Sequence, residues 1–273
     1  DQQHALLPKV AAGELLLSLA VDETPRHNPS QVSTRLESKG DGFVLNGRKQ
    51  FVIDGHVADK LIVSARSSGA DSERDGISLL LVDRTAAGVK VERVSMADSR
   101  NAALVTFTDV AVAASDLLGE AGKGFDALEL TLDVVNGQLA AELLGLSLEA
   151  FERTVAYLQE RKQFGVTLSS FQGLQHRCAH LFSELELVKS VVLKALMALD
   201  EGDEDASMLV SLAKAKASEV AELATNEAVQ MHGGMGMTDE FDIGLFMKRA
   251  RCVQALFGDF RYHANRFALL RGY

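Results

Sequence analysis

Arg161-Lys-Gln-Phe164-Gly165 opens the part of the sequence that decides the fold. Two further stretches belong with it, namely Phe171-Gln-Gly-Leu-Gln175-His and Gln230-Met-His-Gly233-Gly234-Met-Gly. An arginine can make charge-assisted, bidentate contacts to a pyrophosphate, and successive glycines at a helix break let backbone amides approach phosphate closely. Each stretch alone is a weak signal. Their spacing on successive predicted helices favours one shared role in binding a phosphate-bearing ligand.

The size and composition of the chain indicate a globular protein of two domains. It has 273 residues, of which 47% are hydrophobic, and a net charge of −10. A chain of this charge is repelled by nucleic acid and by anionic membrane surfaces, so neither is predicted as a partner. The sequence contains no apolar run of the roughly 20 residues that a membrane helix needs.

The first part of the chain is rich in short β-type runs separated by turn residues. The predicted strands are Leu15–Val21, Gly42–Ile53, Lys60–Ala65, Ser78–Val82, Val89–Val94 and Ala103–Phe107. Asn46-Gly47, inside the second run, is a typical hairpin signal. The pattern predicts a small β-barrel or sandwich over residues 15–120.

From Gly124 onward the hydrophobic period becomes helical. Two apolar stripes predict two long helices; the first is Leu128, Leu132, Val135, Leu139, Leu143 and Leu146, and the second is Leu174, Cys178, Leu181, Leu185, Val188, Val192, Ala195 and Leu199. A third helix is predicted from about Ala206 to Met231 and a fourth from about Phe241 to Leu270, separated by the Gly233–Gly236 break. We therefore expect a four-helix bundle over residues 121–273.

The cysteine and histidine residues give no metal or disulfide framework. Cys178 and Cys252 lie among apolar helical neighbours and are predicted to be free thiols, as suits a reducing compartment. His176 and His180 are spaced i, i+4, which can place two imidazoles on one helix face, but no third ligand is apparent. No metal site is predicted.

A β-domain followed by a helical bundle that carries these motifs resembles the middle and C-terminal domains of the acyl-CoA dehydrogenase family, over essentially the whole chain. The family's N-terminal helical domain is almost wholly absent. Residues 1–14, with Leu7-Pro8 and Gly13-Glu14, look like the last stretch of that domain. We expect that either the chain is incomplete or the missing part is a separate segment.

The resemblance implies FAD as the cofactor. In the family, FAD lies across a subunit interface, with its isoalloxazine held by one subunit and its adenosine diphosphate end clamped by the C-terminal domain of a neighbour. The residues that look like this clamp are Arg161, Phe164, Gln175, Gln230, Gly233 and Gly234.

The flavin-facing positions match the family less well. In the family, a strand with the sequence Trp-Ile-Thr/Ser packs against the flavin ring. The corresponding residues here are Phe51-Val52-Ile53, so Phe51 keeps an aromatic side chain at this place, but the hydroxyl group is lost. The family's glycine-rich flavin and thioester loop has become Val21–Ser30, which contains no glycine. The close backbone approach that glycine allows is lost with it.

The general base of the family is also missing. Alignment through Arg249-Ala-Arg251 places Gly258 where the family has its glutamate, and the position used by a second branch of the family falls on Val135. Neither residue can accept a proton. Asp259 is the one nearby carboxylate, but a shift of one residue on a helix turns a side chain by about 100 degrees, so it is a weak candidate.

The leading hypothesis is a non-catalytic subunit of a heterotetrameric acyl-CoA dehydrogenase, arranged as a dimer of heterodimers. A catalytic partner subunit would carry the glutamate, the complex would desaturate an acyl-CoA of fatty acid or steroid side-chain type, and electrons would leave through an electron-transfer flavoprotein. One alternative is a self-sufficient homotetramer with Asp259 as the base; another is a flavin-free structural subunit. A cytoplasmic location is expected, with the mitochondrial matrix as the alternative.

Overall fold

The computed structural model describes residues 2–273, which form two compact units. The first unit extends to Glu129 and the second is Leu130–Tyr273. Helix α2, Phe125–Glu160, begins in the first unit and continues through the second. The β-domain followed by a helical domain that the sequence predicts is confirmed.

The first unit is built on one eight-stranded sheet, preceded by the short helix α1, Gln2–Ala11. Its strands are β1 Leu17–Ala20, β2 Arg35–Lys39, β3 Gly42–Ile53, β4 Lys60–Arg66, β5 Ile77–Asp83, β6 Val89–Ser95, β7 Asn101–Ala113 and β8 Leu117–Leu118. The strand order is β6-β7-β3-β2-β4-β5-β8, and β1 pairs in parallel with β4. All six predicted strands are present, and β2 and β8 were missed.

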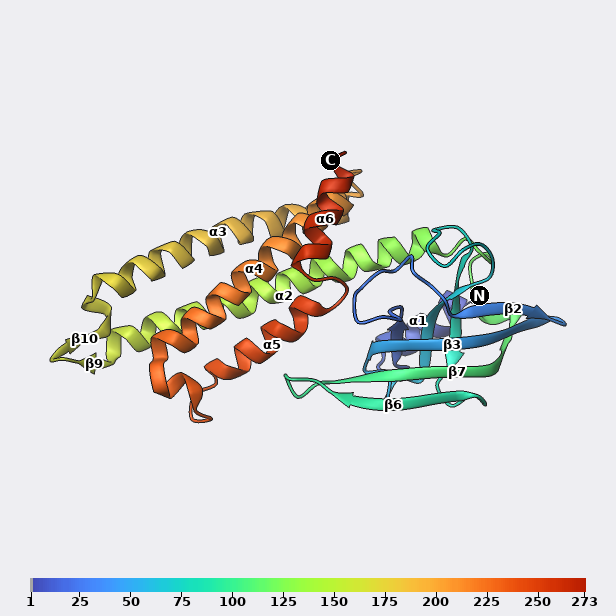
Figure 1. Ribbon diagram of the computed structural model, residues 1–273, viewed down its shortest axis with the longest axis horizontal. Helices are drawn as coiled ribbons and strands as arrows, with labels where there is room; N and C mark the ends of the chain where they lie inside the picture. Colours follow the sequence, from blue (N-terminus) through green and yellow to red (C-terminus); the bar gives the residue numbers. More distant parts are fainter. Residues whose placement is uncertain (1) are drawn as a thin grey trace. The chain divides into compact units, whose positions relative to one another are not determined.

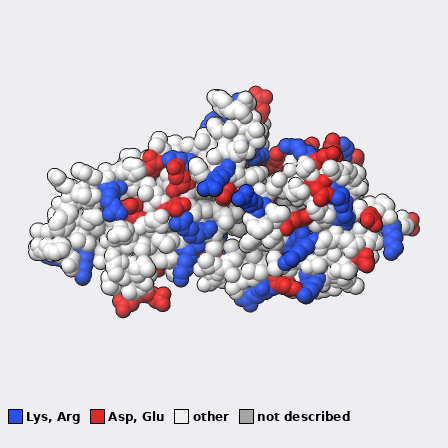
Figure 2. Space-filling model, in the orientation of Figure 1, with Lys and Arg blue, Asp and Glu red and all other residues white. Residues whose placement is uncertain are grey.

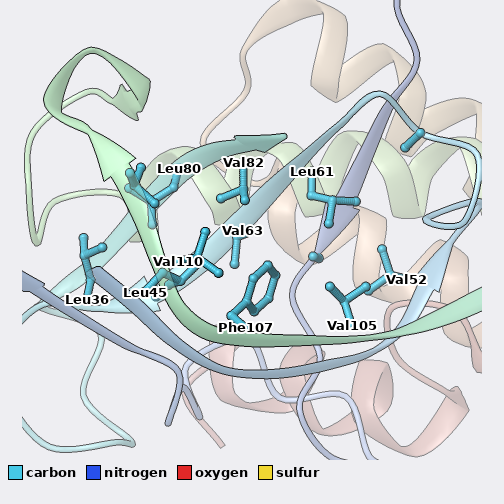
Figure 3. Packing of buried hydrophobic residues seen from close by; sticks show 14 of the residues in the cluster. Leu36, Leu45, Val52, Leu61, Val63, Leu80, Val82, Val105, Phe107 and Val110 are labelled. Carbon is cyan, nitrogen blue, oxygen red and sulfur yellow. The ribbon is translucent and has the colours of Figure 1, made fainter. Parts of the chain in front are cut away.

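Alternating side chains of these strands form the core of the first unit. Figure 3 shows side chains from several strands converging on one interior, where Leu45, Leu61, Val105 and Phe107 are at most 2% exposed. Large apolar side chains that meet in this way provide most of the stability of such a sheet.

The hairpin predicted at Asn46-Gly47 is wrong. Strand β3 runs through these residues without a turn and pairs with β7 on both sides of a register shift between Leu45 and Gly47. The Asn46 side chain bonds across to Asp109, whose backbone N–H donates to Asn46 Oδ1 at 2.8 Å. The bulge itself lies on β7, where Thr108 and Asp109, the latter at φ +49°, stand opposite Asn46. The actual hairpin joins β2 to β3 through Gly40, at φ +59°.

The second unit is a bundle of long helices (Figure 1). Besides α2 it contains α3, Gln172–Glu201, and α4, Ala206–His232, followed by α5, Ile243–Ala255, and α6, Phe260–Leu270. Helix α4 is central, because α3, α5 and α6 all pack against it. It can do so because its buried face is dominated by small residues such as Ala213, Ala217, Ala221 and Ala224.

The single fourth helix predicted from Phe241 to Leu270 is wrong. The chain leaves the helix after Ala255, makes a turn over residues 256–259 and starts α6 at Phe260. The Asp259 side chain caps α6 by accepting the Tyr262 N–H at 2.9 Å. A periodicity argument missed this turn because apolar residues continue across it.

A buried ion pair fixes α6 to the bundle. Arg266 donates to both carboxylate oxygens of Asp133 in α2, at 2.7 and 3.1 Å, and to the Ser211 hydroxyl of α4 at 2.9 Å. The Ser207 hydroxyl donates to the same carboxylate at 2.6 Å. Buried charges of this kind are tolerated only when they are fully paired, so the network specifies one position for α6.

No helix among residues 2–273 is both long and apolar enough to cross a membrane. In this part of the chain neither Cys252, which is buried, nor Cys178, which is partly exposed, forms a disulfide. Within the same residues, histidine, cysteine and carboxylate side chains form no cluster of metal-binding composition.

Candidate functional site

A β-hairpin presents Arg161 and Phe164 at the end of α2. Strands β9, Lys162–Gln163, and β10, Val166–Thr167, pair antiparallel around a two-residue turn at Phe164 and Gly165. Both turn residues have positive φ, +55° and +82°, as tight hairpin turns require. The left-handed conformation is uncommon for a phenylalanine, and here it leaves the side chain 91% exposed with only an edge contact to Phe171.

Gln175 lies beside the base of this hairpin. It sits in the first turn of α3, and its side-chain amide donates to the Ser169 carbonyl at 2.8 Å. The hairpin itself is closed by the Leu168 N–H, which donates to the Arg161 carbonyl at 2.8 Å. The side chains of Arg161 and Gln175 both remain exposed. Three of the predicted clamp residues are thus brought together at one corner of the helical unit.

The glycines after α4 differ from one another. Gly233 ends the helix at φ +59°, and side chains added at Gly233 or Gly234 would meet nothing within 4 Å. By contrast, a Cβ at Gly236 would lie 2.8 Å from the Val229 carbonyl oxygen. The first two glycines therefore leave backbone open to an incoming ligand, whereas Gly236 is required by packing.

An aromatic stack connects the ends of α2 and α4. The rings of Tyr157 and His232 lie 4.2 Å apart, and the His232 Nδ1–H donates to the Ala228 carbonyl at 2.7 Å. Burial lowers the pKa of His232, which keeps the imidazole neutral. The stack holds the two chain segments that carry Arg161 and Gly233 at the same end of the unit, as Figure 1 shows.

A hollow of about 1160 Å³ adjoins this end of the bundle. It is lined by residues near the ends of α2 and α4, among them Tyr157, Arg161 and His232, and by residues 236–245, Met247 and Lys248. Its lining is mixed in charge, because it includes Arg153, Arg161 and Lys248 together with Glu160 and the carboxylates of the segment 239–242. Figure 2 likewise shows basic and acidic side chains interspersed over the visible face rather than gathered into one patch of a single sign.

Phe51, the predicted flavin plate, belongs to the first unit. It sits at a second register shift of β3, between Lys49 and Val52, with φ +53° and 47% of its surface exposed. Non-glycine residues rarely hold such a conformation unless their surroundings enforce it. Here the Gln50 N–H donates to the Asp22 carbonyl at 2.7 Å, which docks the loop after β1 onto the strand.

A buried ion pair fixes that loop to the sheet. The fully buried Lys49 amine donates to Glu23 Oε1 at 2.7 Å, to the Ser64 hydroxyl at 2.9 Å and to the Val21 carbonyl at 3.0 Å. Burial lowers the pKa of Lys49; burial alone would raise the pKa of Glu23, but the amine and its hydrogen bonds leave it lowered overall. In the sequence, the only signal for Lys49 is a charged residue at an inward position of a strand.

Asp259 and Gly258 lie away from the clamp, at the opposite end of α5. That helix has 13 residues and spans roughly 20 Å. The turn before α6 has two consecutive positive φ values, +50° at Phe257 and +110° at Gly258. Asp259 faces a smaller hollow of about 540 Å³, which is also lined by Glu219 and Glu222 of α4.

Lys214 of α4 holds this turn in place. Its amine donates to the carbonyls of Val253, Leu256 and Gly258 at 3.0–3.1 Å, and to that of Gln254 at 3.4 Å. Burial lowers the pKa of Lys214 to about 7, while the charge of Asp259 acts in the opposite direction. A lysine within an alanine-rich helix face is the only signal in the sequence for this role.

The comparisons with known proteins identify the family. The middle-domain model of acyl-CoA dehydrogenases matches residues 22–110, and the C-terminal-domain model matches residues 122–268. The chain belongs to the acyl-CoA dehydrogenase family. This confirms the resemblance drawn from the sequence, and with it FAD as the cofactor that the family uses.

Relatives and solved structures agree with this assignment. The chain is 31% identical to the short/branched chain specific acyl-CoA dehydrogenase of Bos taurus, over 92% of this chain and 58% of that protein. It is also 31% identical to the probable acyl-CoA dehydrogenase YngJ of Bacillus subtilis, over 93% of this chain and 68% of that protein. The acyl-CoA dehydrogenase structure from Geobacillus kaustophilus superposes with a TM-score of 0.94 at 28% identity, covering all of this chain and 73% of that one. The chain thus spans about three fifths to two thirds of these two relatives' lengths.

Replacing Lys214 with methionine is expected to weaken the fold in a pH-dependent way. At neutral pH the substitution leaves these buried carbonyl groups without their hydrogen-bond donor, which lowers the unfolding free energy by on the order of 2–4 kcal/mol. Between pH 7 and about 10.5 the unfolded chain binds a proton that the folded Lys214 has released, so the wild-type unfolding free energy gains about 1.4 kcal/mol per pH unit from this residue. The Met variant lacks that gain.

Urea titrations at pH 7, 8 and 9 measure the effect. Lys216→Met is the matched control on the same helix, because Lys216 is ion-paired and partly exposed and keeps its proton over this range. A constant difference between wild type and Lys214→Met across the three pH values would contradict the lowered pKa of Lys214.

Proposed function

We propose that this chain is the non-catalytic partner in a heteromeric acyl-CoA dehydrogenase, and that its helical unit clamps the adenosine diphosphate part of an FAD held by the other subunit. The complex catalyses α,β-desaturation of an acyl-CoA thioester. When bound, FAD supplies the acceptor for the hydride that leaves the β-carbon. The glutamate that removes the α-proton belongs to the partner subunit.

One contrast carries the proposal. The clamp groups are intact and point outward, with Phe164 91% exposed and open backbone at Gly233 and Gly234. The turn over residues 256–259, where the sequence analysis expects the family's general base, carries no glutamate, and its one carboxylate, Asp259, caps α6. A chain that had lost flavin altogether would have no use for an exposed phenylalanine held at positive φ beside an arginine.

The clamp residues suit the charged end of FAD. The Arg161 guanidinium can form two parallel hydrogen bonds to pyrophosphate oxygens. The backbone at Gly233 and Gly234 follows a helix end and can approach a phosphate or ribose without side-chain obstruction. Phe164 offers a flat apolar face, and the amides of Gln175 and Gln230 can fix the orientation of the ligand by hydrogen bonds.

The part of this chain that would hold the flavin ring of its own FAD fits that ligand less well than the clamp fits the adenosine diphosphate end. The Val21–Ser30 loop has no glycine, and its Glu23 is occupied by Lys49 and by the backbone N–H groups of Ser33 and Thr34. Ile53 supplies no hydroxyl. Phe51 alone remains available to contact a flavin ring. These features support one FAD for each pair of different chains.

Two other hypotheses are alternatives to this proposal. In a self-sufficient homotetramer, Asp259 would act as the base, yet its carboxylate is engaged in capping α6. In a flavin-free structural subunit, the clamp would have no ligand. The acyl group is proposed only as a fatty acid or steroid side-chain thioester, with an electron-transfer flavoprotein as electron acceptor and a cytoplasmic or mitochondrial matrix location.

Arg161→Ala is expected to lower the flavin content of the native complex. Loss of a charged hydrogen bond costs about 1.5–3 kcal/mol, which corresponds to roughly 10- to 100-fold weaker binding of FAD. Flavin absorbance after dialysis against known FAD concentrations measures the effect. Lys162→Ala, on the neighbouring hairpin residue, is the control and should change affinity less than about twofold. Equal FAD affinity in wild type and Arg161→Ala would count against the clamp.

Asp259→Asn separates the proposal from the homotetramer. Asparagine caps a helix N-terminus about as well as aspartate, so the fold is retained, but its amide cannot take up a proton. We expect turnover of the complex to remain within about twofold of wild type, measured by reduction of a flavin-linked dye with acyl-CoA. Loss of turnover by several orders of magnitude, with unchanged flavin absorbance, would identify Asp259 as the base.

A further inference from the structure

The backbone of Phe164 is fixed, but little holds its ring. The residue occupies the turn of the β9–β10 hairpin at φ +55°, and 91% of its surface is exposed. An exposed side chain exchanges between rotamers, and a ligand that binds only one of them loses affinity to the ordering of that side chain. A neighbour that restricts the ring of Phe164 therefore strengthens binding without touching the ligand.

The ring of Phe171 is placed to restrict it. The two ring centroids lie 6.3 Å apart with the ring planes at 88°, which is the edge-to-face arrangement that aromatic pairs favour. Phe171 is itself 37% exposed, so the pair lies at the surface of the helical unit. Its contact with a clamp residue, more than its burial, is what distinguishes Phe171.

The backbone of Phe171 is held between the hairpin and α3. Its N–H donates to the Leu168 carbonyl at 3.1 Å, and its carbonyl accepts the Gln175 N–H at 3.1 Å. Leu168 in turn donates to the Arg161 carbonyl at 2.8 Å. The segment that ends at Phe171 is thus joined to the base of the hairpin on one side and to a clamp residue of α3 on the other.

We propose that Phe171 is a positioning residue for FAD binding, because its ring sets the direction in which Phe164 presents its flat face to the ligand. Phe171 acts through Phe164 and makes no contact of its own with FAD. The inference rests on the proposed function, in which Phe164 belongs to the clamp, and it adds a residue that prepares the clamp before the ligand arrives.

Phe171→Ala in the native complex is expected to weaken FAD binding by about 3- to 10-fold, because an aromatic pair contributes that much. Flavin absorbance after dialysis against known FAD concentrations measures the affinity. Phe182→Ala is the matched control, since Phe182 also lies on α3, is 53% exposed and has an aromatic neighbour, Phe151, at 6.4 Å. It should change the affinity less than about twofold. Equal FAD affinity in wild type and Phe171→Ala would overturn the proposal.

Two conservative substitutions separate the aromatic contact from the bulk of the side chain. Phe171→Tyr keeps the ring and should bind FAD within about twofold of wild type. Phe171→Leu keeps a large apolar side chain, and with it the fold, but has no ring; it should bind FAD at least about threefold more weakly than wild type. Equal affinities of the Tyr and Leu variants would contradict a role for the aromatic contact.

A double-mutant cycle tests whether Phe171 acts through Phe164. Phe164→Ala removes the ring that is positioned, so adding Phe171→Ala to it should weaken FAD binding by less than about 1.5-fold further. Two independent losses that multiply would overturn the proposal.

The single variants also distinguish this inference from the proposed function. If Phe164→Ala leaves the FAD affinity unchanged, the clamp fails and the role of Phe171 fails with it. If Phe164→Ala weakens binding while Phe171→Ala does not, the clamp stands and only the positioning role is overturned.

Discussion

The buried amine of Lys214 is the interaction on which the second unit's arrangement depends. It reaches from the central helix α4 to carbonyls at the end of α5 and in the turn that follows. Helix ends leave carbonyl groups without intrahelical partners, and a buried end must find other donors. By supplying them, Lys214 permits two successive positive φ values and sets the start of α6, which the Arg266–Asp133 pair then secures to α2.

The two ends of α5 have opposite characters. At its beginning lie the open glycines and the hollow that Arg161 borders, where the backbone can receive a ligand. At its end, the turn is filled by aromatic rings and fixed by hydrogen bonds. Helix α5 thus joins an open surface, where we propose that FAD binds, to a turn whose conformation is fixed by packing.

The parts of the fold that depend on a local sequence signal were predictable. The bounds of β3 follow from a β-rich run that turn residues precede and follow. The clamp assigned to three short stretches stays a prediction. The Asn46-Gly47 signal failed because β3 pairs here with β7, a strand far away in the sequence, and this pairing continues on both sides of the Asn-Gly pair. Lys49 and Lys214 were missed because a buried charge is stabilised by acceptors far away in sequence.

The most direct test of the non-catalytic role is to purify the native complex that contains this chain, resolve its subunits by mass and count FAD per chain from flavin absorbance. We expect one FAD for every two chains, with a second, different subunit that carries the glutamate. One FAD for each copy of a single identical chain would contradict the proposed role.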